Sequence, residues 1–196
     1  KKLEASRWNV LFDRIEAGTY LVAGAITNGH VKVNKIDPET INIVSEKLMD
    51  MGVEVNIGSD FVEVDATSSD LKAQDIFTEP FPGFPTDMQA QFMTLSTIAS
   101  GTCIIEETVF ENRFQHVSQL RKMGADITLN KNKASVSGVS NLVGANVRAS
   151  DLRASASLVL AGLVGKNKTE INDIYHIDRG YECIEEKLNK LGAEII

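Results

Sequence analysis

Hydrophobic residues along this chain follow two spacings, one typical of helices and one typical of strands. Between Pro38 and Met51 the apolar residues recur every three to four positions, at Ile41, Val44, Leu48 and Met51. Glutamate and lysine occupy the opposite face of this stretch. The pattern predicts a helix that packs one side against a core and leaves the other side in water.

Shorter stretches around this helix alternate between apolar and polar residues. Val31 to Asn34 has the alternation of a half-exposed strand. Val53 to Ile57 and Phe61 to Val64 alternate in the same way on either side of the turn Gly58-Ser59-Asp60, which predicts a hairpin.

The segment that precedes these elements predicts one further strand and one further helix. Trp8 to Phe12 is short and apolar, as expected of a strand. Asp13 and Glu16 have the spacing of a capping box, and Asn28-Gly29 is a natural helix end, so a helix is expected between them. The resulting order of elements is β-α-β-α-β-β.

The same order of elements occurs three times in the chain. An aspartate stands near the start of a nearly uncharged helix in each copy, at Asp13, Asp87 and Asp151. A glycine turn ends the charged helix of each copy, at Gly52, Gly124 and Gly192. The distance between the two marks is about 40 residues each time, within the range of structural repeats. We therefore expect one domain, 1–196, with repeats at about 7–70, 71–142 and 143–196, of which the last is incomplete.

The second and third copies predict their own set of elements. In the second copy these are a strand within Gln74 to Phe84, a helix from Asp87, a strand over Thr102 to Glu106, a helix over Glu111 to Met123 and a hairpin around Asn130-Lys131-Asn132. In the third copy they are a helix over Leu152 to Leu163 and a strand over Ala193 to Ile196, which would have no second strand.

The character of the helices predicts how these elements are layered. The first helix of each copy is apolar almost all round, and such helices are usually buried on several sides. The strands alternate, so that one face of each sheet meets water. We therefore expect an α/β fold of the inside-out kind, a bundle of βαβαββ repeats with helices inside and sheets outside.

Composition and charge narrow the possible functions. The 196 residues are 43% hydrophobic and 24% charged, as in an ordinary soluble protein. The net charge of -7 argues against a general nucleic-acid surface. The longest uncharged run, Met88 to Ile105, is interrupted by polar residues, which argues against a membrane span. No basic and apolar leader precedes Trp8, so there is no sign of secretion, and two cysteines without a disulfide framework make a reducing cytoplasm the expected location.

Cysteine and histidine suggest no metal or cofactor chemistry. Cys103 and Cys183 are far apart and have no disulfide or metal-site spacing, and both are expected to be buried and unreactive. Histidines are scattered, and His176 is interpreted as structural. Neither a glycine-rich phosphate loop nor a metal-ligand cluster is visible, so no cofactor is expected.

Aspartate and arginine are the side chains that could carry chemistry. Asp87 is expected in the first turn of a helix, where backbone N–H groups favour the ionised carboxylate. It could equally be only a helix-start residue, as Asp13 and Asp151 could be. Arginines cluster in or beside the same motifs, at Arg14, Arg113, Arg148, Arg153 and Arg179. A guanidinium can hold a carboxylate or a phosphate with two hydrogen bonds. The alternative pairs each with a nearby acid: Arg113 with Glu111, Arg153 with Asp151 and Arg179 with Asp178.

Five motifs together resemble the enolpyruvyl transferase family, and they span nearly the whole chain. They are Asp13–Thr19, Phe84–Phe92, Thr108–Phe114, Asp151–Gly162 and Tyr175–Tyr181. The resemblance implies an enzyme of two inside-out α/β domains of three repeats each, with the active site in the cleft between them. This chain would be one domain, and the family's cysteine-bearing loop and Lys-Asn pair would belong to the absent partner domain.

The resemblance also implies roles for particular residues. In the members that act on nucleotide sugars, the enolpyruvyl group of phosphoenolpyruvate moves to the 3′-hydroxyl of UDP-N-acetylglucosamine and phosphate leaves, as the first committed step of peptidoglycan synthesis. Asp87 would bind the sugar hydroxyl and act as the catalytic base, and Val109 would contact the UDP-sugar. Four residues would lie on the phosphoenolpyruvate side of the cleft: Arg113, Asp151, Arg153 and Arg179.

Two other functions remain open from the sequence. The first is the related enzyme that loads the same group onto shikimate 3-phosphate, although Asn112-Arg113-Phe114 and His176–Arg179 match the sugar-nucleotide members better. The second is a non-catalytic ligand-binding module. The absent loop cysteine and the unfinished hairpin favour an isolated chain that is inactive.

Overall fold

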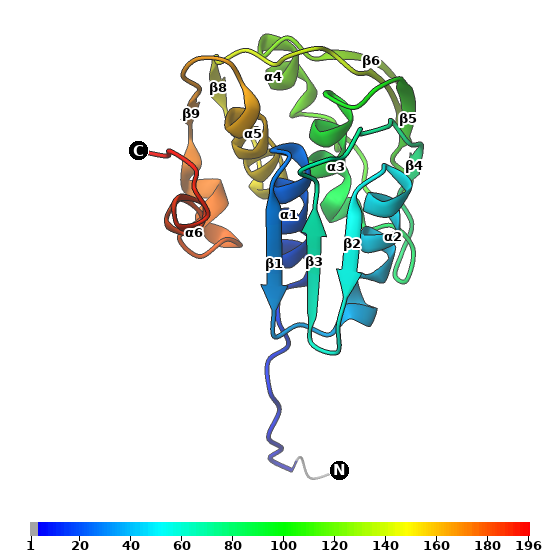
Figure 1. Ribbon diagram of the computed structural model, residues 1–196, viewed down its shortest axis with the longest axis vertical. Coiled ribbons are helices and arrows are strands. Elements are labelled where there is room, and N and C mark those ends of the chain that lie inside the picture. The colour runs from blue at the N-terminus through cyan, green and yellow to red at the C-terminus, as the bar shows by residue number, and fades with distance from the viewer. Residues whose placement is uncertain (1–3) are drawn as a thin grey trace.

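The computed structural model describes residues 4–196, which form an α/β bundle (Figure 1). Its α-helices are α1 (Arg14–Ile26), α2 (Asn42–Asp50), α3 (Gln89–Ser96), α4 (Val117–Lys122), α5 (Leu152–Val164) and α6 (Ile184–Lys190). Short 3-10 helices are η1 (Pro38–Ile41), η2 (Thr86–Met88) and η3 (Ile174–Arg179). The strands are β1 (His30–Asn34), β2 (Glu54–Ile57), β3 (Phe61–Asp65), β4 (Ile76–Phe77), β5 (Thr102–Glu106), β6 (Asp126–Asn130), β7 (Lys133–Ser137), β8 (Asn146–Arg148) and β9 (Glu170–Asn172).

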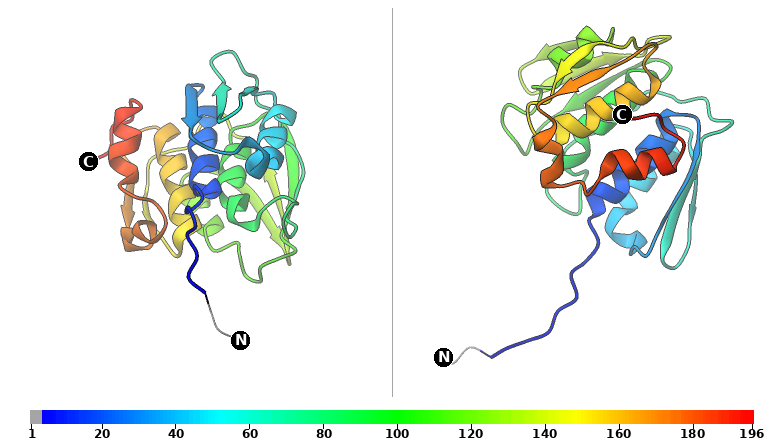
Figure 2. Two further views of the ribbon diagram at one scale, coloured as in Figure 1. Left: turned by 90° about the horizontal axis from the view of Figure 1, so that it is seen from below. Right: turned by 90° about the vertical axis from the view of Figure 1, so that its left-hand side faces the viewer.

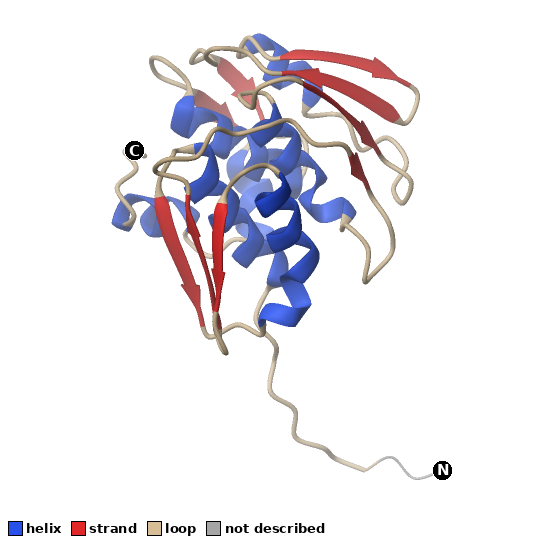
Figure 3. Cartoon of the chain, turned by 45° about the vertical axis from the view of Figure 1, so that its right-hand side comes forward, coloured by secondary structure: helices blue, strands red, loops and turns tan. Residues whose placement is uncertain are grey.

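Three helices, α1, α3 and α5, contact one another at the centre of the molecule. Every residue of α3 is buried, and α1 and α5 expose little of their surface. Their composition explains this position, because a helix that is apolar almost all round loses least when other elements cover it on several sides. Figure 3 shows these helices between sheets that lie at the periphery.

Three sheets surround the central helices. The first has the order β1-β3-β2 and is antiparallel throughout. The second has the order β4-β5-β7-β6, with β4 parallel to β5, and the third pairs β8 with β9 in parallel. Along β3 and β7, half-buried or exposed residues alternate with fully buried ones, so each strand turns one face toward the helices. The predicted arrangement of helices inside and sheets outside is therefore confirmed.

Most of the predicted elements are present, and four differ for identifiable reasons. Trp8 to Phe12 is not a strand: the side chains of Trp8 and Val10 are 88% and 98% exposed, and no strand among residues 4–196 pairs with the segment. A strand without a neighbour leaves its backbone hydrogen-bonding groups unpaired. Residues 1–3 of the expected domain lie outside the described residues. In Figure 2 the N-terminal segment runs away from the bundle.

The other differences follow from local backbone chemistry. Strand β4 is limited to two residues, and the prolines that follow it lack the N–H that a ladder needs. The segment before Val117 forms turns instead of the expected helix, and Asn112 within it has a left-handed φ of 58°. Ala193 to Ile196 is not a strand, because the backbone of Ile195 is bonded to the side chain of Asn189 at 2.8 Å through both N–H and C=O.

Within the described part of the chain, no helix combines the length and the apolar composition needed to cross a lipid bilayer.

Candidate active site at the helix starts

The starts of the three central helices lie at one end of the bundle. Arg153 of α5 contacts Asp87 of η2, the turn that leads into α3. The Arg14 guanidinium of α1 lies 5.3 Å from the centre of the Phe81 ring, in the loop before η2. Helix α6 lies beside α1 through an ion pair of 2.7 Å between Lys187 and Glu16 (Figure 2). Residues far apart in sequence therefore meet at one rim.

Asp13 and Asp151 cap their helices. The Oδ1 atom of Asp13 accepts hydrogen bonds from the backbone N–H groups of Ile15 and Glu16, at 2.8 and 3.0 Å. The Oδ1 atom of Asp151 accepts from Arg153 and Ala154 in the same way, at 2.9 and 3.0 Å. These contacts satisfy amides that have no partner inside a helix.

Asp87 is held quite differently, by two arginine side chains. Arg113 Nη2 lies 2.6 Å from Asp87 Oδ1, and Arg153 Nη2 lies 3.4 Å from Asp87 Oδ2. The N-cap residue of η2 is Pro85, which makes no side-chain cap. Neither arginine side chain forms an ion pair with the acid nearest to it in sequence, so the alternative that pairs Arg113 with Glu111 and Arg153 with Asp151 is wrong.

The burial of these three side chains gives the site its electrostatic character. The side chains of Arg113 and Arg153 are only 14% and 12% exposed, whereas that of Asp87 is 41% exposed. Two nearly buried guanidinium groups thus share one carboxylate, which leaves an excess of positive charge at an accessible point. Such an arrangement can bind an anion with planar, charge-assisted hydrogen bonds.

Arg153 has a second partner on its other side, Tyr181. Its Nη1 atom lies 3.5 Å from the Tyr181 hydroxyl, and its guanidinium carbon lies 5.8 Å from the centre of the ring. Burial disfavours the charged guanidinium, but Tyr181 and Asp87 outweigh that effect and raise the pKa of Arg153. The charge of Arg153 is therefore secure although its side chain is nearly buried.

The segment that carries Arg179 packs against the start of α5 through its backbone. Arg179 ends η3, and Gly180 follows directly. A Cβ atom on Gly180 would lie 2.9 Å from Leu152 Cδ2, so this segment packs closely against the start of α5, and a larger residue there would require the Leu152 side chain to shift. Arg179 itself is exposed, and among residues 4–196 no ion pair joins it to Asp178 or to another acid.

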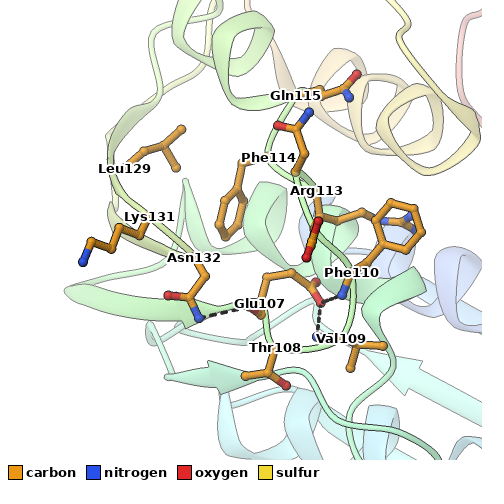
Figure 4. Close-up of a pocket in the computed structure, with 12 residues that line it drawn as sticks. Glu107, Thr108, Val109, Phe110, Arg113, Phe114, Gln115, Leu129, Lys131 and Asn132 are labelled. Carbon is orange, nitrogen blue, oxygen red and sulfur yellow. Dashed lines mark hydrogen bonds between the residues drawn. The ribbon is translucent and has the colours of Figure 1, made fainter.

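A pocket of about 490 Å³ opens next to this rim, with Arg113 in its wall (Figure 4). It is lined by residues 107–115, Leu129, Lys131 and Asn132. Val109 and Phe110 are 43% and 56% exposed there, which places two apolar side chains at the surface of a partly polar pocket. The Arg113 guanidinium carbon lies 4.9 Å from the centre of the Phe110 ring and so connects the pocket to Asp87.

Glu107 is a buried carboxylate that holds the backbone of the pocket loop, and it was not among the residues singled out from the sequence. Only 5% of this residue is exposed. Its carboxylate accepts hydrogen bonds from the hydroxyls of Thr78 and Thr86 at 2.8 Å. It also accepts from the N–H groups of Val109 and Phe110 at 2.9 Å (Figure 4). Because Thr86 precedes Asp87, one buried carboxylate ties the pocket loop to the Asp87 turn.

His116 is buried near Arg113, and the two cysteines differ in exposure. His116 is buried, and this burial, with a smaller contribution from Arg113, lowers its pKa to about 4, so the imidazole is neutral near pH 7. Cys183 is exposed, with a left-handed φ of 46°, so the expectation that both cysteines are buried is wrong for this one. Cys103 is buried as expected, which raises the pKa of its thiol.

The remaining arginines take other roles. Arg148 pairs with Asp173 at 2.8 Å, and its side chain is 74% exposed. Arg148 lies on β8, and its ion-pair partner Asp173 is not part of the Asp87 cluster. Of the arginines singled out in the sequence, Arg113 and Arg153 are therefore the two that the fold joins to Asp87.

Comparisons with known proteins fit this geometry. Residues 1–188 match the model of the family described as EPSP synthase (3-phosphoshikimate 1-carboxyvinyltransferase). Among curated relatives, the UDP-N-acetylglucosamine 1-carboxyvinyltransferases of Coxiella burnetii strains Dugway 5J108-111 and RSA 493 are both 56% identical over 194 residues. The match covers 99% of this chain but only 45% of either relative, so the chain spans less than half of their length.

Solved structures give the same result. The enolpyruvyl transferase NikO from Streptomyces tendae superposes with a TM-score of 0.83 at 29% identity, over 94% of this chain and 44% of NikO. EPSP synthase from Acinetobacter baumannii gives a TM-score of 0.63 at 18% identity, over 89% of this chain and 44% of that protein, and thus shares the fold. The chain therefore belongs to the EPSP synthase family of enolpyruvyl transferases.

Proposed function

We propose that this chain is one of the two domains of a UDP-N-acetylglucosamine 1-carboxyvinyltransferase. The enzyme would move the enolpyruvyl group of phosphoenolpyruvate to the 3′-hydroxyl of UDP-N-acetylglucosamine and release phosphate, in the cytoplasmic, first committed step of peptidoglycan synthesis. The observation that carries the proposal is the sharing of Asp87 by Arg113 and Arg153 at an accessible rim. The relatives that bear this name, at 56% identity, support it.

The cationic side chains fit the charges of phosphoenolpyruvate. This substrate has a carboxylate and a phosphate, and guanidinium groups bind both with paired hydrogen bonds. Arg153 and Arg179 would hold it, while Arg113 and Asp151 would line the same side of the cleft. Preset cations also stabilise the charge that develops as the hydroxyl adds and phosphate leaves.

Asp87 would act on the sugar hydroxyl. In the free chain its carboxylate is paired with both arginines, and it is also 41% exposed. An anionic substrate would compete for those guanidinium groups and release the carboxylate toward a hydroxyl placed above it. Asp87 would then accept the hydroxyl proton as the sugar oxygen bonds to C2 of phosphoenolpyruvate and C3 takes up a proton. Loss of a C3 proton together with the phosphate group would restore the double bond in the product. A carboxylate is a weak base, so much of its contribution would come from positioning.

The pocket beside Arg113 would receive part of the UDP-sugar. Val109 lies in the wall of this pocket, and its N–H group donates to the Glu107 carboxylate. The backbone C=O and the side chain of Val109 would therefore be the groups that contact the UDP-sugar. The enzyme would be completed by a second domain that closes over this rim. In this domain the three repeats would be those at about 7–70, 71–142 and 143–196.

The test compares the natural full-length protein with the isolated chain. The full-length protein should release phosphate from phosphoenolpyruvate when UDP-N-acetylglucosamine is present. Release with shikimate 3-phosphate alone would instead assign the acceptor named in the family's description. The isolated 196-residue chain should show no turnover and at most weak anion binding, because it supplies only one side of the cleft. Turnover by the isolated chain would contradict the two-domain site.

A further inference from the structure

One buried hydroxyl joins the three central helices directly behind Arg153. Tyr181 is 1% exposed, and its hydroxyl lies 2.9 Å from Thr19 Oγ1 of α1 and 3.4 Å from Gln91 Nε2 of α3. The same hydroxyl meets Arg153 Nη1 of α5 at 3.5 Å. Gln91 Nε2 also donates to Thr19 Oγ1 at 3.1 Å. Thr19 and Gln91 are themselves buried, their side-chain hydrogen bonds in the described residues do not go to Asp87, and neither residue lines the pocket.

The helix backbone decides the direction of every hydrogen bond in this network. A threonine hydroxyl has one proton, and that of Thr19 goes to the C=O of Ile15, at 2.8 Å. Thr19 can therefore only accept from Tyr181, so the tyrosine proton points at Thr19. Burial raises the pKa of Tyr181, so the hydroxyl keeps its proton near neutral pH.

This direction has a consequence for Arg153. With its proton committed to Thr19, the Tyr181 oxygen presents a lone pair to the guanidinium and no competing proton. Arg153 is then held along two edges, by Tyr181 through Nη1 and by Asp87 through Nη2. If the tyrosine hydroxyl were removed, Asp87 would be the one polar partner left to the Arg153 guanidinium in the described residues. The guanidinium could then turn toward the Asp87 carboxylate and away from a substrate.

We infer that Thr19, Gln91 and Tyr181 form a positioning network that orients Arg153 toward phosphoenolpyruvate. Tyr181 follows Arg179 and Gly180 directly, so the same anchor also fixes the segment that carries the second proposed phosphoenolpyruvate ligand. The inference deepens the proposed function and rests on it. None of the three residues would touch the substrate; they would act through Arg153.

The test uses four variants of the full-length protein. Tyr181→Phe removes the hydroxyl and keeps the ring. Thr19→Val removes the group that orients the Tyr181 proton, and Thr19→Ser restores it. Tyr20→Phe is the matched control, because the Tyr20 hydroxyl is buried on the same helix and makes no hydrogen bond among residues 4–196. Melting temperatures identify any variant that fails to fold.

The kinetic result should separate the two substrates. Tyr181→Phe should raise the KM for phosphoenolpyruvate about tenfold, the value expected for loss of one hydrogen bond to a charged group. Thr19→Val should raise it less, and Thr19→Ser and Tyr20→Phe should match the parent. The KM for UDP-N-acetylglucosamine should stay unchanged in all four. Equal kinetics for Tyr181→Phe and Tyr20→Phe would overturn the inference, as would a defect of Thr19→Ser as large as that of Thr19→Val.

A second readout needs no substrate. The side-chain N–H signals of Arg153, identified by their loss in Arg153→Lys, should exchange faster with solvent in Tyr181→Phe and Thr19→Val than in Tyr20→Phe. Faster exchange without turnover on either acceptor would support the network and refute the proposed function. Unchanged exchange in an active enzyme would overturn the network and leave the function standing.

Discussion

The central helices begin in two different ways, although all three starts carry an aspartate. In α1 and α5 the aspartate stands before the helix in extended backbone, and one oxygen of its carboxylate accepts from two backbone amides. In the third case Pro85 occupies the cap position, and Asp87 lies inside the turn, paired only with arginine side chains in the described structure. A shift of the aspartate relative to the cap thus separates a structural residue from a candidate functional one.

The two kinds of helix start differ in whether a bound anion can take over the hydrogen-bond partners of the carboxylate. The partners of Asp13 and Asp151 are backbone amides fixed in the first turn of a helix, and each aspartate supplies the acceptor that these amides otherwise lack. The partners of Asp87 are two guanidinium groups with further donors, and a bound anion can take them without any change in secondary structure. The excess of positive charge at Asp87 therefore makes this start, and not the other two, suited to substrate exchange.

Replacing the unusual aspartate should have the largest effect. In the full-length protein, Asp87→Asn should lower turnover by about 100- to 10,000-fold, the range for loss of a general base. The free energy of unfolding should change much less, because the carboxylate is partly exposed. Asp13→Asn is the matched control, since asparagine caps a helix as well as aspartate does. Steady-state rates and urea unfolding measure both effects; an unchanged rate would reduce Asp87 to a structural partner of the arginines.

A pH titration tests whether the two arginines alone supply the positive charge. Burial lowers the pKa of His116 to about 4 in the folded chain, whereas the unfolded chain has the ordinary value near 6.5. Between these values the unfolded state binds more protons, so this contribution to stability is complete above pH 6.5 and is lost as the pH falls toward 4. The full loss is about 3 kcal/mol. Urea unfolding at several pH values measures it.

The exposed His30 provides the control for this titration. His30 is 54% exposed and pairs with Glu63, so His30→Gln should leave most of the decline between pH 6.5 and 4 in place. His116→Gln should flatten that decline. If the free energy of unfolding of His116→Gln fell with pH as steeply as that of the parent, the imidazole of His116 would not be held neutral by burial. It would then count as a third cation beside Arg113 and Arg153.

The sequence predicted the helices and sheets well where their signals are local. The expected strand Thr102 to Glu106 has the observed bounds, and the helix expected over Leu152 to Leu163 runs to Val164. Caps and periodic apolar positions are encoded within a few residues, which explains this agreement. The strand expected over Trp8 to Phe12 failed because a strand also needs a neighbour, and its own sequence does not specify one.

The candidate site was predicted by residue type but not by partner. Arg113 and Arg153 were expected at the substrate, with pairing to nearby acids as the alternative, and their link to Asp87 joins positions distant in sequence. Glu107 had a usable signal, because it continues the buried face of Cys103 and Ile105 at every second position. The link from Tyr181 to Arg153 had no such signal, since it depends on how the segment after η3 packs against α5.

Shape as well as charge should matter at the arginines. Arg153→Lys keeps the positive charge, but one ammonium cannot reach Asp87 and Tyr181 along two edges as the guanidinium does. The affinity of the full-length protein for phosphoenolpyruvate should fall about tenfold, as expected for one charge-assisted hydrogen bond. Calorimetry measures this affinity. Arg148→Lys is the control, because its exposed ion pair with Asp173 lies away from the rim; equal losses in both variants would mean that only overall charge matters.

The smallest effect is expected at an ordinary helix start. Asp13→Ala removes the acceptor for the N–H groups of Ile15 and Glu16 and should lower the free energy of unfolding by about 1 kcal/mol. Asp13→Ser supplies another capping oxygen and should recover most of that loss. Turnover per folded molecule should stay at the parent value in both, because this carboxylate contacts neither arginine of the Asp87 cluster. A drop in turnover that Asp13→Ser does not recover would show that the cap also serves the site, and would remove the distinction between the two kinds of helix start.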